Sequence, residues 1–251
     1  MNFRILIIIL LLLPLCHFAA KNDSVLPVLQ PIHKNVIKFN PTPMLLWDIR
    51  NLTFSYERIL NPRQSISLEL GFLAMPRLFE DTIAQLVNIT SHKKYGVNAT
   101  IEYRFYISKL NRRPIPAGLY IGPYLTFYGY KFRNGLDILQ TSVDKSATIE
   151  GNFWAFNLGF EVGYQFIFWK RLSLDLILLG PSLTYYGGST GISGNLDPGQ
   201  IQAIHEALYD KLKERFPAMG YFPVNKSFRQ TGKLDVLLFG FRYLVQVGFH
   251  F

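Results

Sequence analysis

Along most of the chain, large apolar side chains alternate with polar or small ones. Successive side chains of a β-strand point to opposite faces, so this period of two predicts strands and argues against amphipathic helices. The clearest runs are Asn98–Ser108, Trp154–Phe168 and Phe239–Phe251. Five further runs alternate less regularly, and a break in phase near Gly180 and Pro181 predicts a bulge in the last of them. These five are Val36–Trp47, Leu52–Leu60, Ser65–Met75, Gly118–Tyr130 and Leu172–Tyr185.

The two faces of the predicted strands differ in chemistry. One face is aromatic and branched, whereas the other combines charged residues with many glycines. A water-soluble barrel turns its bulky apolar face inward, but a membrane barrel turns that face to lipid and its polar face to the interior. Runs such as Asn98–Ser108 exceed the usual strand length of about 5 or 6 residues and suffice for the roughly 9 to 11 that cross a bilayer. Strand length therefore favours the membrane arrangement.

Short and long connections alternate between the predicted strands. This alternation is typical of outer-membrane barrels, whose tight turns lie at the periplasmic rim and whose longer loops lie outside. The first hairpin, near Asp48–Asn51, departs from the rule because its loop is short where a long one is expected. The short connections are Asn61–Gln64, Lys109–Pro116 and Trp169–Arg171, and the long ones are Pro76–Tyr95, Lys131–Gly151 and Tyr186–Gly232.

The predicted fold is all-β, an eight-stranded antiparallel up-and-down transmembrane β-barrel with a helical insertion in its last extracellular loop. An even strand count places both ends of the barrel at one rim, and pairing of the last strand with the first leaves no edge in lipid. The insertion is expected at about residues 196–217, where Asp197 is a candidate N-cap and Pro198 suits the first turn. Apolar residues recur there at helical spacing, namely Ile201, Ile204, Leu208, Leu212 and Phe216. This stripe either packs on the barrel mouth or contacts a partner or a lipid surface.

The N-terminal segment has the pattern of a secretory signal peptide. Arg4 precedes the apolar run Ile5–Leu13, and small residues follow near position 20. We expect a signal peptide at residues 1–20, a periplasmic lead at 21–34 and the barrel at 35–251. A retained membrane anchor is the alternative. Cys16, the only cysteine, invites lipidation, although Leu15 stands where such sites usually carry a small residue.

Composition supports a surface that does not face water everywhere. Hydrophobic residues make up 49% of the chain and charged residues 17%, below the roughly 25% of soluble domains. The net charge of +9 is not concentrated on any one segment, which argues against nucleic acid and favours anionic lipid head groups. Seven basic residues lie in or beside the short connections: Arg58, Arg63, Lys109, Arg112, Arg113, Lys170 and Arg171.

Two stretches of the sequence carry a resemblance to known barrels. The ending "VQVGFHF" resembles the C-terminal signal by which the outer-membrane assembly machinery selects its substrates; the residues concerned are Tyr243, Val245, Val247, Phe249 and Phe251. Asn35–Phe72, followed by "GLYIGPY", is similar to an uncharacterised family of small outer-membrane barrels of Bacteroidetes, with the architecture of OmpA and OmpX. The resemblance implies a fold and an outer-membrane location in a Gram-negative bacterium, and it implies no catalytic residue.

The polar faces of the strands are expected to meet inside the barrel. An eight-stranded barrel has room only for side chains, and buried charges must be paired. We therefore predict a packed network that includes an ion pair between Lys38 and Glu57, with a narrow water-filled channel as the alternative. The network residues are Lys38, Glu57, Glu69, Glu102, Arg104, Glu161, Asp175 and Arg242.

The sequence contains few candidate catalytic or ligand-binding residues. Carboxylates deep in a filled barrel are out of reach of substrate, and no metal-ligand spacing, cofactor motif or nucleophile elbow appears. Among the histidines, His92 beside Ser91 is the one candidate for a loop-borne catalytic residue.

We expect no catalytic, cofactor or metal site, and a non-enzymatic role in surface binding, adhesion or envelope integrity. The expected partners are membrane lipids, the assembly machinery and a protein or glycan that contacts the long loops. The alternatives are a loop-borne lipid-modifying or proteolytic enzyme, and a secreted soluble barrel that binds a hydrophobic ligand.

Overall fold

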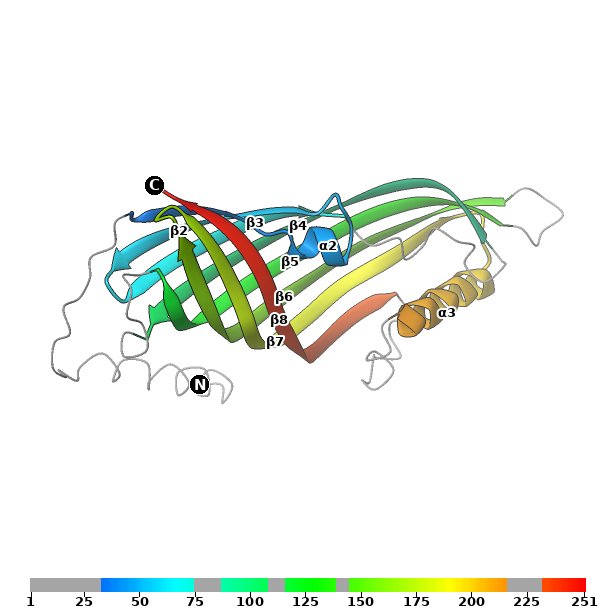
Figure 1. Ribbon diagram of the computed structural model, residues 1–251. Coiled ribbons are helices and arrows are strands. Elements are labelled where there is room, and N and C mark those ends of the chain that lie inside the picture. The colour runs from blue at the N-terminus through cyan, green and yellow to red at the C-terminus, as the bar shows by residue number, and fades with distance from the viewer. Residues whose placement is uncertain (1–32, 75–86, 108–115, 139–144, 216–231) are drawn as a thin grey trace, which may run out of the picture.

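The computed structural model describes residues 33–74, 87–107, 116–138, 145–215 and 232–251. These residues form eight antiparallel strands that close into an up-and-down barrel, in which each strand pairs with the next and β1 pairs with β8 (Figure 1). The predicted all-β barrel architecture is thereby confirmed. The strands are β1 (Asn35–Phe39), β2 (Leu52–Asn61), β3 (Gln64–Leu73), β4 (Val87–Tyr106), β5 (Gly118–Ile138), β6 (Lys145–Phe168), β7 (Leu172–Gly194) and β8 (Lys233–His250), and the helices are α2 (Thr42–Leu46) and α3 (Pro198–Arg215).

The alternation of side chains in the sequence becomes alternation of burial in the barrel. Along β2, Thr53, Ser55 and Glu57 are buried, whereas the residues between them, Phe54 and Tyr56, are exposed. The apolar face therefore points away from the barrel axis, and the polar face points toward it. This is the reverse of the arrangement in a water-soluble barrel.

The end of the chain completes the barrel wall. Backbone hydrogen bonds join Asn35 and Phe251 in both directions, at 2.9 and 3.2 Å, and the His250 amide donates to the Arg171 carbonyl at 2.7 Å. The last residues thus belong to a closing strand that has a partner on each side at this rim.

A tight turn and a bulge shape this part of the wall. Between β6 and β7, Trp169 and Lys170 both have positive φ, at 47° and 63°, which is the backbone of a tight hairpin turn that matches the strand twist. The predicted bulge is confirmed, because the register of β7 against β8 shifts between Ile177 and Gly180.

The first strand is shorter than predicted. β1 ends at Phe39, and the residues expected to continue it form α2 instead. Pro41 and Pro43 lack the backbone N–H that a strand ladder needs, and the Thr42 amide donates to the Asn40 side chain at 3.1 Å. The first hairpin is therefore not a tight turn near Asp48 but a longer connection that contains a helix.

Five strands extend well beyond the runs predicted from the sequence, and β8 is one of them because it begins at Lys233 rather than near Phe239. β4 begins at Val87, β5 continues to Ile138, β6 begins at Lys145 and β7 continues to Gly194, so much of the predicted long loops is ladder. In the extension of β6 the alternation is reversed, because the apolar Ala147, Ile149 and Phe153 face inward and the polar Glu150 and Asn152 face outward. His92, predicted to lie in a loop, lies in β4.

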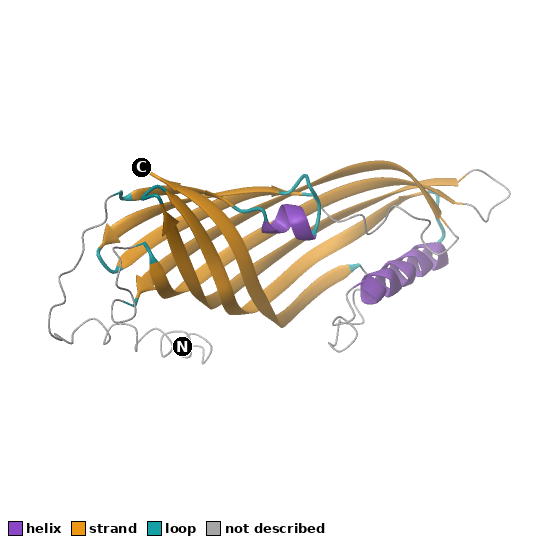
Figure 2. Cartoon of the chain, in the orientation of Figure 1, coloured by secondary structure: helices purple, strands orange, loops and turns teal. Residues whose placement is uncertain are grey.

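The barrel consequently has two zones of unequal completeness. Near the rim that holds the C-terminus, all eight strands form the wall, while β4 to β8 continue beyond the ends of β1, β2 and β3 (Figure 2). We call this continuation the outer sheet. The helix α3 lies at its far end (Figure 1). No helix of the described residues is both long and apolar enough to span a bilayer.

Candidate functional site: a buried ion-pair network

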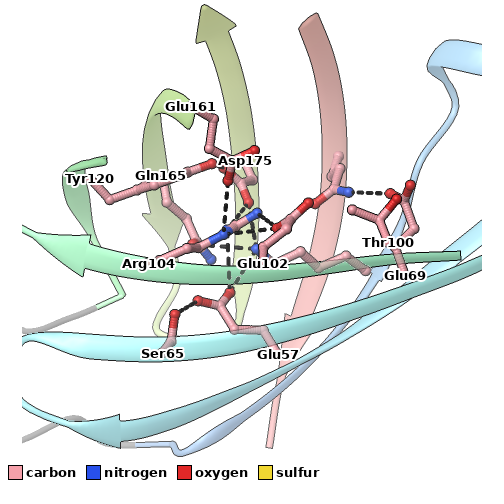
Figure 3. A network of polar contacts seen from close by, with 12 residues as sticks. Glu57, Ser65, Glu69, Thr100, Glu102, Arg104, Tyr120, Glu161, Gln165 and Asp175 are labelled. Atoms are coloured by element: carbon pink, nitrogen blue, oxygen red, sulfur yellow. Dashed lines mark hydrogen bonds and ion pairs between the residues drawn. The ribbon is translucent and has the colours of Figure 1, made fainter. Parts of the chain in front are cut away.

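Eight charged residues from seven strands meet inside the complete part of the barrel (Figure 3). Alternation of the strands turns each of them toward the axis, and every one is buried. They are the residues that the sequence analysis grouped as an interior network: Lys38, Glu57, Glu69, Glu102, Arg104, Glu161, Asp175 and Arg242.

Lys38 and Arg104 organise the first half of this network. The Lys38 ammonium lies 2.7 Å from Glu57 and 2.5 Å from Asp175. The Arg104 guanidinium shares Asp175, at 2.5 Å, and forms a second ion pair with Glu102 at 2.6 Å. Asp175 on β7 thus joins cations from β1 and β4, across the interior of the barrel.

Arg242 on β8 organises the second half. Its guanidinium contacts Glu102 at 2.6 Å and Glu161 at 2.9 Å, and Glu69 lies 3.8 Å away. Because Glu102 contacts both arginines, the ion pairs form one continuous network from Lys38 to Arg242. Such mutual pairing is what a buried charge requires, since an unpaired one costs several kcal/mol.

Buried tyrosines complete the coordination of the charges. Tyr106 donates to Glu57 at 2.9 Å, and Tyr120 donates to Asp175 at 2.7 Å. The rings also lie against the cations, with the Arg104 guanidinium 4.4 Å from the centroid of Tyr120 and that of Arg242 5.0 Å from the centroid of Tyr124. Cation–π contact in a buried site adds to the stabilisation of the arginines.

Glycines on β6 make room for these rings. A Cβ at Gly163 would overlap the ring and hydroxyl of Tyr120, and one at Gly159 would lie 2.7 Å from Tyr124. Glycine is therefore required on the inward face of β6 at these two positions by close approach of a side chain from β5.

Neutral polar residues surround Glu69 at the edge of the network. Gln246 donates to it at 2.7 Å, Asn40 at 3.1 Å and Asn98 at 3.4 Å. Ser65 donates to Glu57 in the same way at the other edge. The interior at this level is filled by side chains that bind one another.

Sequence reasoning missed the uncharged members of the network. Tyr106, Tyr120, Tyr124, Gln165 and Gln246 lie on the same inward face as the charged residues, so the signal was present in the alternation. A tyrosine counts as apolar in such a pattern, however. The pattern does not show that its hydroxyl donates a hydrogen bond to a buried carboxylate.

The remaining predicted site residues lie elsewhere. The closing-strand residues Tyr243, Val245, Val247, Phe249 and Phe251 are all exposed on the outer surface. On α3, Ile204 is buried and Ile201 is half-buried, and Leu208 and Leu212 follow on the same helix, while Phe216 lies outside the described residues. Residues 1–32, with Cys16 and the predicted signal peptide, also lie outside them, as do Lys109, Arg112 and Arg113.

A second buried polar group lies at the far end of the outer sheet. His205 on α3 is buried beside Gly232 and Thr190, and burial lowers the pKa of its imidazole. Among the described residues, no cluster of histidine, cysteine, aspartate and glutamate is arranged to hold a metal ion.

Comparison with known proteins shows a family and a distant structural likeness. The search of curated proteins gives no match. The crystal structure of a major outer membrane protein from Thermus thermophilus aligns over 88% of this chain and 100% of that chain, with 13% sequence identity and a TM-score of 0.34. The model of a family described as "Protein of unknown function (DUF3575)" matches residues 8–185. The chain therefore belongs to the DUF3575 family.

Proposed function

We propose that this protein is a transmembrane β-barrel of a Gram-negative outer membrane. The observation that carries the proposal is the sidedness of the wall. Outward-facing Phe239 is 86% exposed, whereas the inward-facing Glu102 and Arg104 are 1% and 0% exposed. Outward apolar and inward polar side chains are what a barrel in lipid requires.

The extent of the outward apolar surface supports the same proposal. On β6 it continues without interruption from Trp154 to Phe168, longer than the roughly 9 to 11 residues with which a tilted strand crosses a bilayer. Soluble monomers rarely expose contiguous apolar patches of more than a few hundred Å². In water this surface would cause association, whereas in hydrocarbon it is the favoured contact.

Aromatic residues mark both limits of this apolar surface. At the outer limit, Trp154 packs edge-on against Tyr185 at 5.2 Å, and at the other limit Phe168 adjoins Trp169. Beyond Trp154 on β6, the polar residues Asn152 and Glu150 are exposed. Aromatic girdles at both interfaces are a regular feature of outer-membrane barrels.

The ion-pair network bears on what such a barrel does. Its side chains fill the interior at one level, which supports a role other than conduction or catalysis, namely surface binding, adhesion or envelope integrity. The expected partners are outer-membrane lipids, the assembly machinery that reads the exposed closing strand, and a protein or glycan at the long loops. The sequence resemblance to small barrels of Bacteroidetes with OmpA-like and OmpX-like architecture leads to the same proposal.

Fractionation of cells that produce the full chain tests the location. We expect the protein in the outer-membrane fraction and a change of gel mobility on heating, because closed barrels resist detergent until heated. Recovery in the soluble periplasmic fraction without a mobility change would contradict the proposal. In planar bilayers, the purified protein is expected to give no steady conductance steps, and their appearance would contradict the filled interior.

A further inference from the structure

The outward apolar surface has a different height on two sides of the barrel. On β2 its last exposed residue is Leu52, nine positions from Asn61 at the rim end of the strand. On β6 it continues to Trp154, fifteen positions from Trp169 at the same rim. A tilted strand gains about 2.5 Å of height per residue, so the surface reaches roughly 15 Å further from this rim on β6 than on β2.

An exposed ion pair ends the apolar surface above β2. The Arg50 guanidinium contacts the Asp48 carboxylate at 2.8 and 2.9 Å, and the Arg50 amide donates to the same carboxylate at 2.9 Å. The Asn51 amide donates to the Asp48 carbonyl at 2.9 Å, and its side chain donates to the Pro43 carbonyl at 3.2 Å. These bonds hold the pair directly beyond β2, with the Arg50 side chain 65% exposed.

The helix α2 and the residues after it present apolar side chains next to the ion pair. The Thr42 hydroxyl accepts from the Val245 amide at 2.8 Å and lies 3.2 Å from the Val245 carbonyl, which places α2 beside β8, about midway along the barrel (Figure 1). The exposed apolar residues here are Leu45, Leu46, Trp47 and Ile49. A tryptophan among apolar side chains and beside charges is typical of a membrane–water interface.

A flat membrane boundary does not suit both sides of this barrel. A boundary at the level of Trp154 would immerse the exposed Arg50 in acyl chains, where a charge is unfavourable. A boundary at the level of Arg50 would leave the exposed rings of Phe156 and Trp154 in water. A bilayer accommodates such a mismatch by changing its thickness locally.

We propose that the outer leaflet is thinner beside α2 than beside β6, and that the Asp48–Arg50 ion pair holds lipid head groups at this lower level. The inference rests on the proposed membrane location. Lipid is favoured over a protein partner because the apolar side chains of α2 continue the outward surface of β2, and the charges adjoin them on the side away from the rim. Acyl chains contact the first and head groups contact the second.

Depth-dependent fluorescence quenching tests this proposal. The full chain with Cys16→Ser carries a fluorescent label at Ile49→Cys or, as the control, at Leu158→Cys. Leu158 lies eleven positions from Trp169, as Arg50 does from Asn61. Vesicles of phosphatidylcholine and phosphatidylglycerol contain a lipid with a nitroxide on its head group or deep in its acyl chain.

We expect the head-group nitroxide to quench the label at Ile49 several-fold more than the acyl-chain nitroxide does, and the reverse order at Leu158. The same order at both positions would overturn the inference and leave the membrane location intact. Absence of quenching at both positions by either lipid would overturn the membrane location itself.

A third label separates local thinning from tilt of the whole barrel. Leu60 is exposed at the rim end of β2. Thinning of the outer leaflet leaves a label at Leu60→Cys at the head groups of the inner leaflet. Preferential quenching of this label by the acyl-chain nitroxide would indicate tilt and would overturn the inference.

Removal of the ion pair tests its role. Asp48→Asn with Arg50→Met removes both charges and keeps a side-chain oxygen that can accept from the backbone amide. We expect quenching of the label at Ile49 to shift several-fold toward the acyl-chain nitroxide. The control, Arg133→Met with Glu150→Gln, removes an exposed ion pair of the outer sheet and should cause no shift. Heat-modifiable mobility confirms that each variant is folded, and an unchanged ratio in the folded Asp48→Asn, Arg50→Met variant would overturn the inference.

Discussion

The complete barrel and the outer sheet are built from the same strands but differ in what those strands turn inward. On β8, Arg242 in the complete barrel binds Glu102 and Glu161, whereas Leu238, on the same face in the outer sheet, lies opposite Thr184 and is half-buried. Alternation fixes which side chains point inward, and their chemistry decides whether they fill the interior. Substitutions in the complete barrel are therefore expected to reduce stability more than substitutions in the outer sheet.

Removal of Arg104 is expected to have the largest effect. In Arg104→Met, Asp175 and Glu102 lose an ion-pair partner in a buried site, and breaking one side of a buried pair costs about 3–5 kcal/mol. Urea titration of the heat-modifiable form in detergent measures the loss. The control is Arg133→Met in the outer sheet, which removes an exposed 2.9 Å pair with Glu150 and should change stability by about 0–1 kcal/mol. Equal losses would show that the network is not what stabilises the closed zone.

A methyl group on the inward face of β6 tests the close packing of the same zone. Gly163→Ala forces the Tyr120 ring away from Asp175, and overpacking of this kind costs about 1–3 kcal/mol. The matched substitution Gly191→Ala in the outer sheet meets no atom within 4 Å and should leave the urea midpoint unchanged. The idea fails if both variants unfold at the wild-type midpoint.

Sequence patterns predicted the barrel and its sidedness because both depend only on the period of side chains along each strand. The first strand was the main error, and Pro41 and Pro43 were the overlooked signal. The sequence pattern could not predict which inward residues bind one another. Lys38 contacts Asp175, which is 137 positions away in the chain. Only the stagger of a closed barrel determines which inward residues lie at the same level. The extension of β6 was missed because its alternation is reversed, and that of β7 because it is rich in glycine and serine, although the two backbones pair with each other as regularly there as in the complete barrel.

Loss of a single hydroxyl is expected to have a smaller effect than removal of Arg104. Tyr120→Phe removes the hydrogen bond to Asp175 but keeps the ring against Arg104, at a cost of about 1.5–3 kcal/mol for a bond to a charged group and less if a water replaces it. Tyr103→Phe removes a 2.9 Å bond to Gln64 near the surface and should cost about 0.5 kcal/mol or less. The same urea titration compares the two, and a larger loss for Tyr103→Phe would contradict the ranking.

The smallest expected effect is a pH dependence at the far end of the outer sheet. Burial of His205 against Thr190 and Gly232 lowers its pKa in the folded protein below the value of about 6.5 in an unfolded segment. The unfolded segment therefore binds the proton more readily, so the packing of α3 is fully stable above about pH 6.5 and weakens as the pH falls below it.

Amide hydrogen exchange over Pro198–Glu206, corrected for the intrinsic pH dependence, should show less protection at pH 5 than at pH 7.5 in the wild type. His205→Gln keeps a polar side chain that does not titrate, so its protection should be the same at both pH values. An equal loss of protection at pH 5 in His205→Gln would show that another group is responsible.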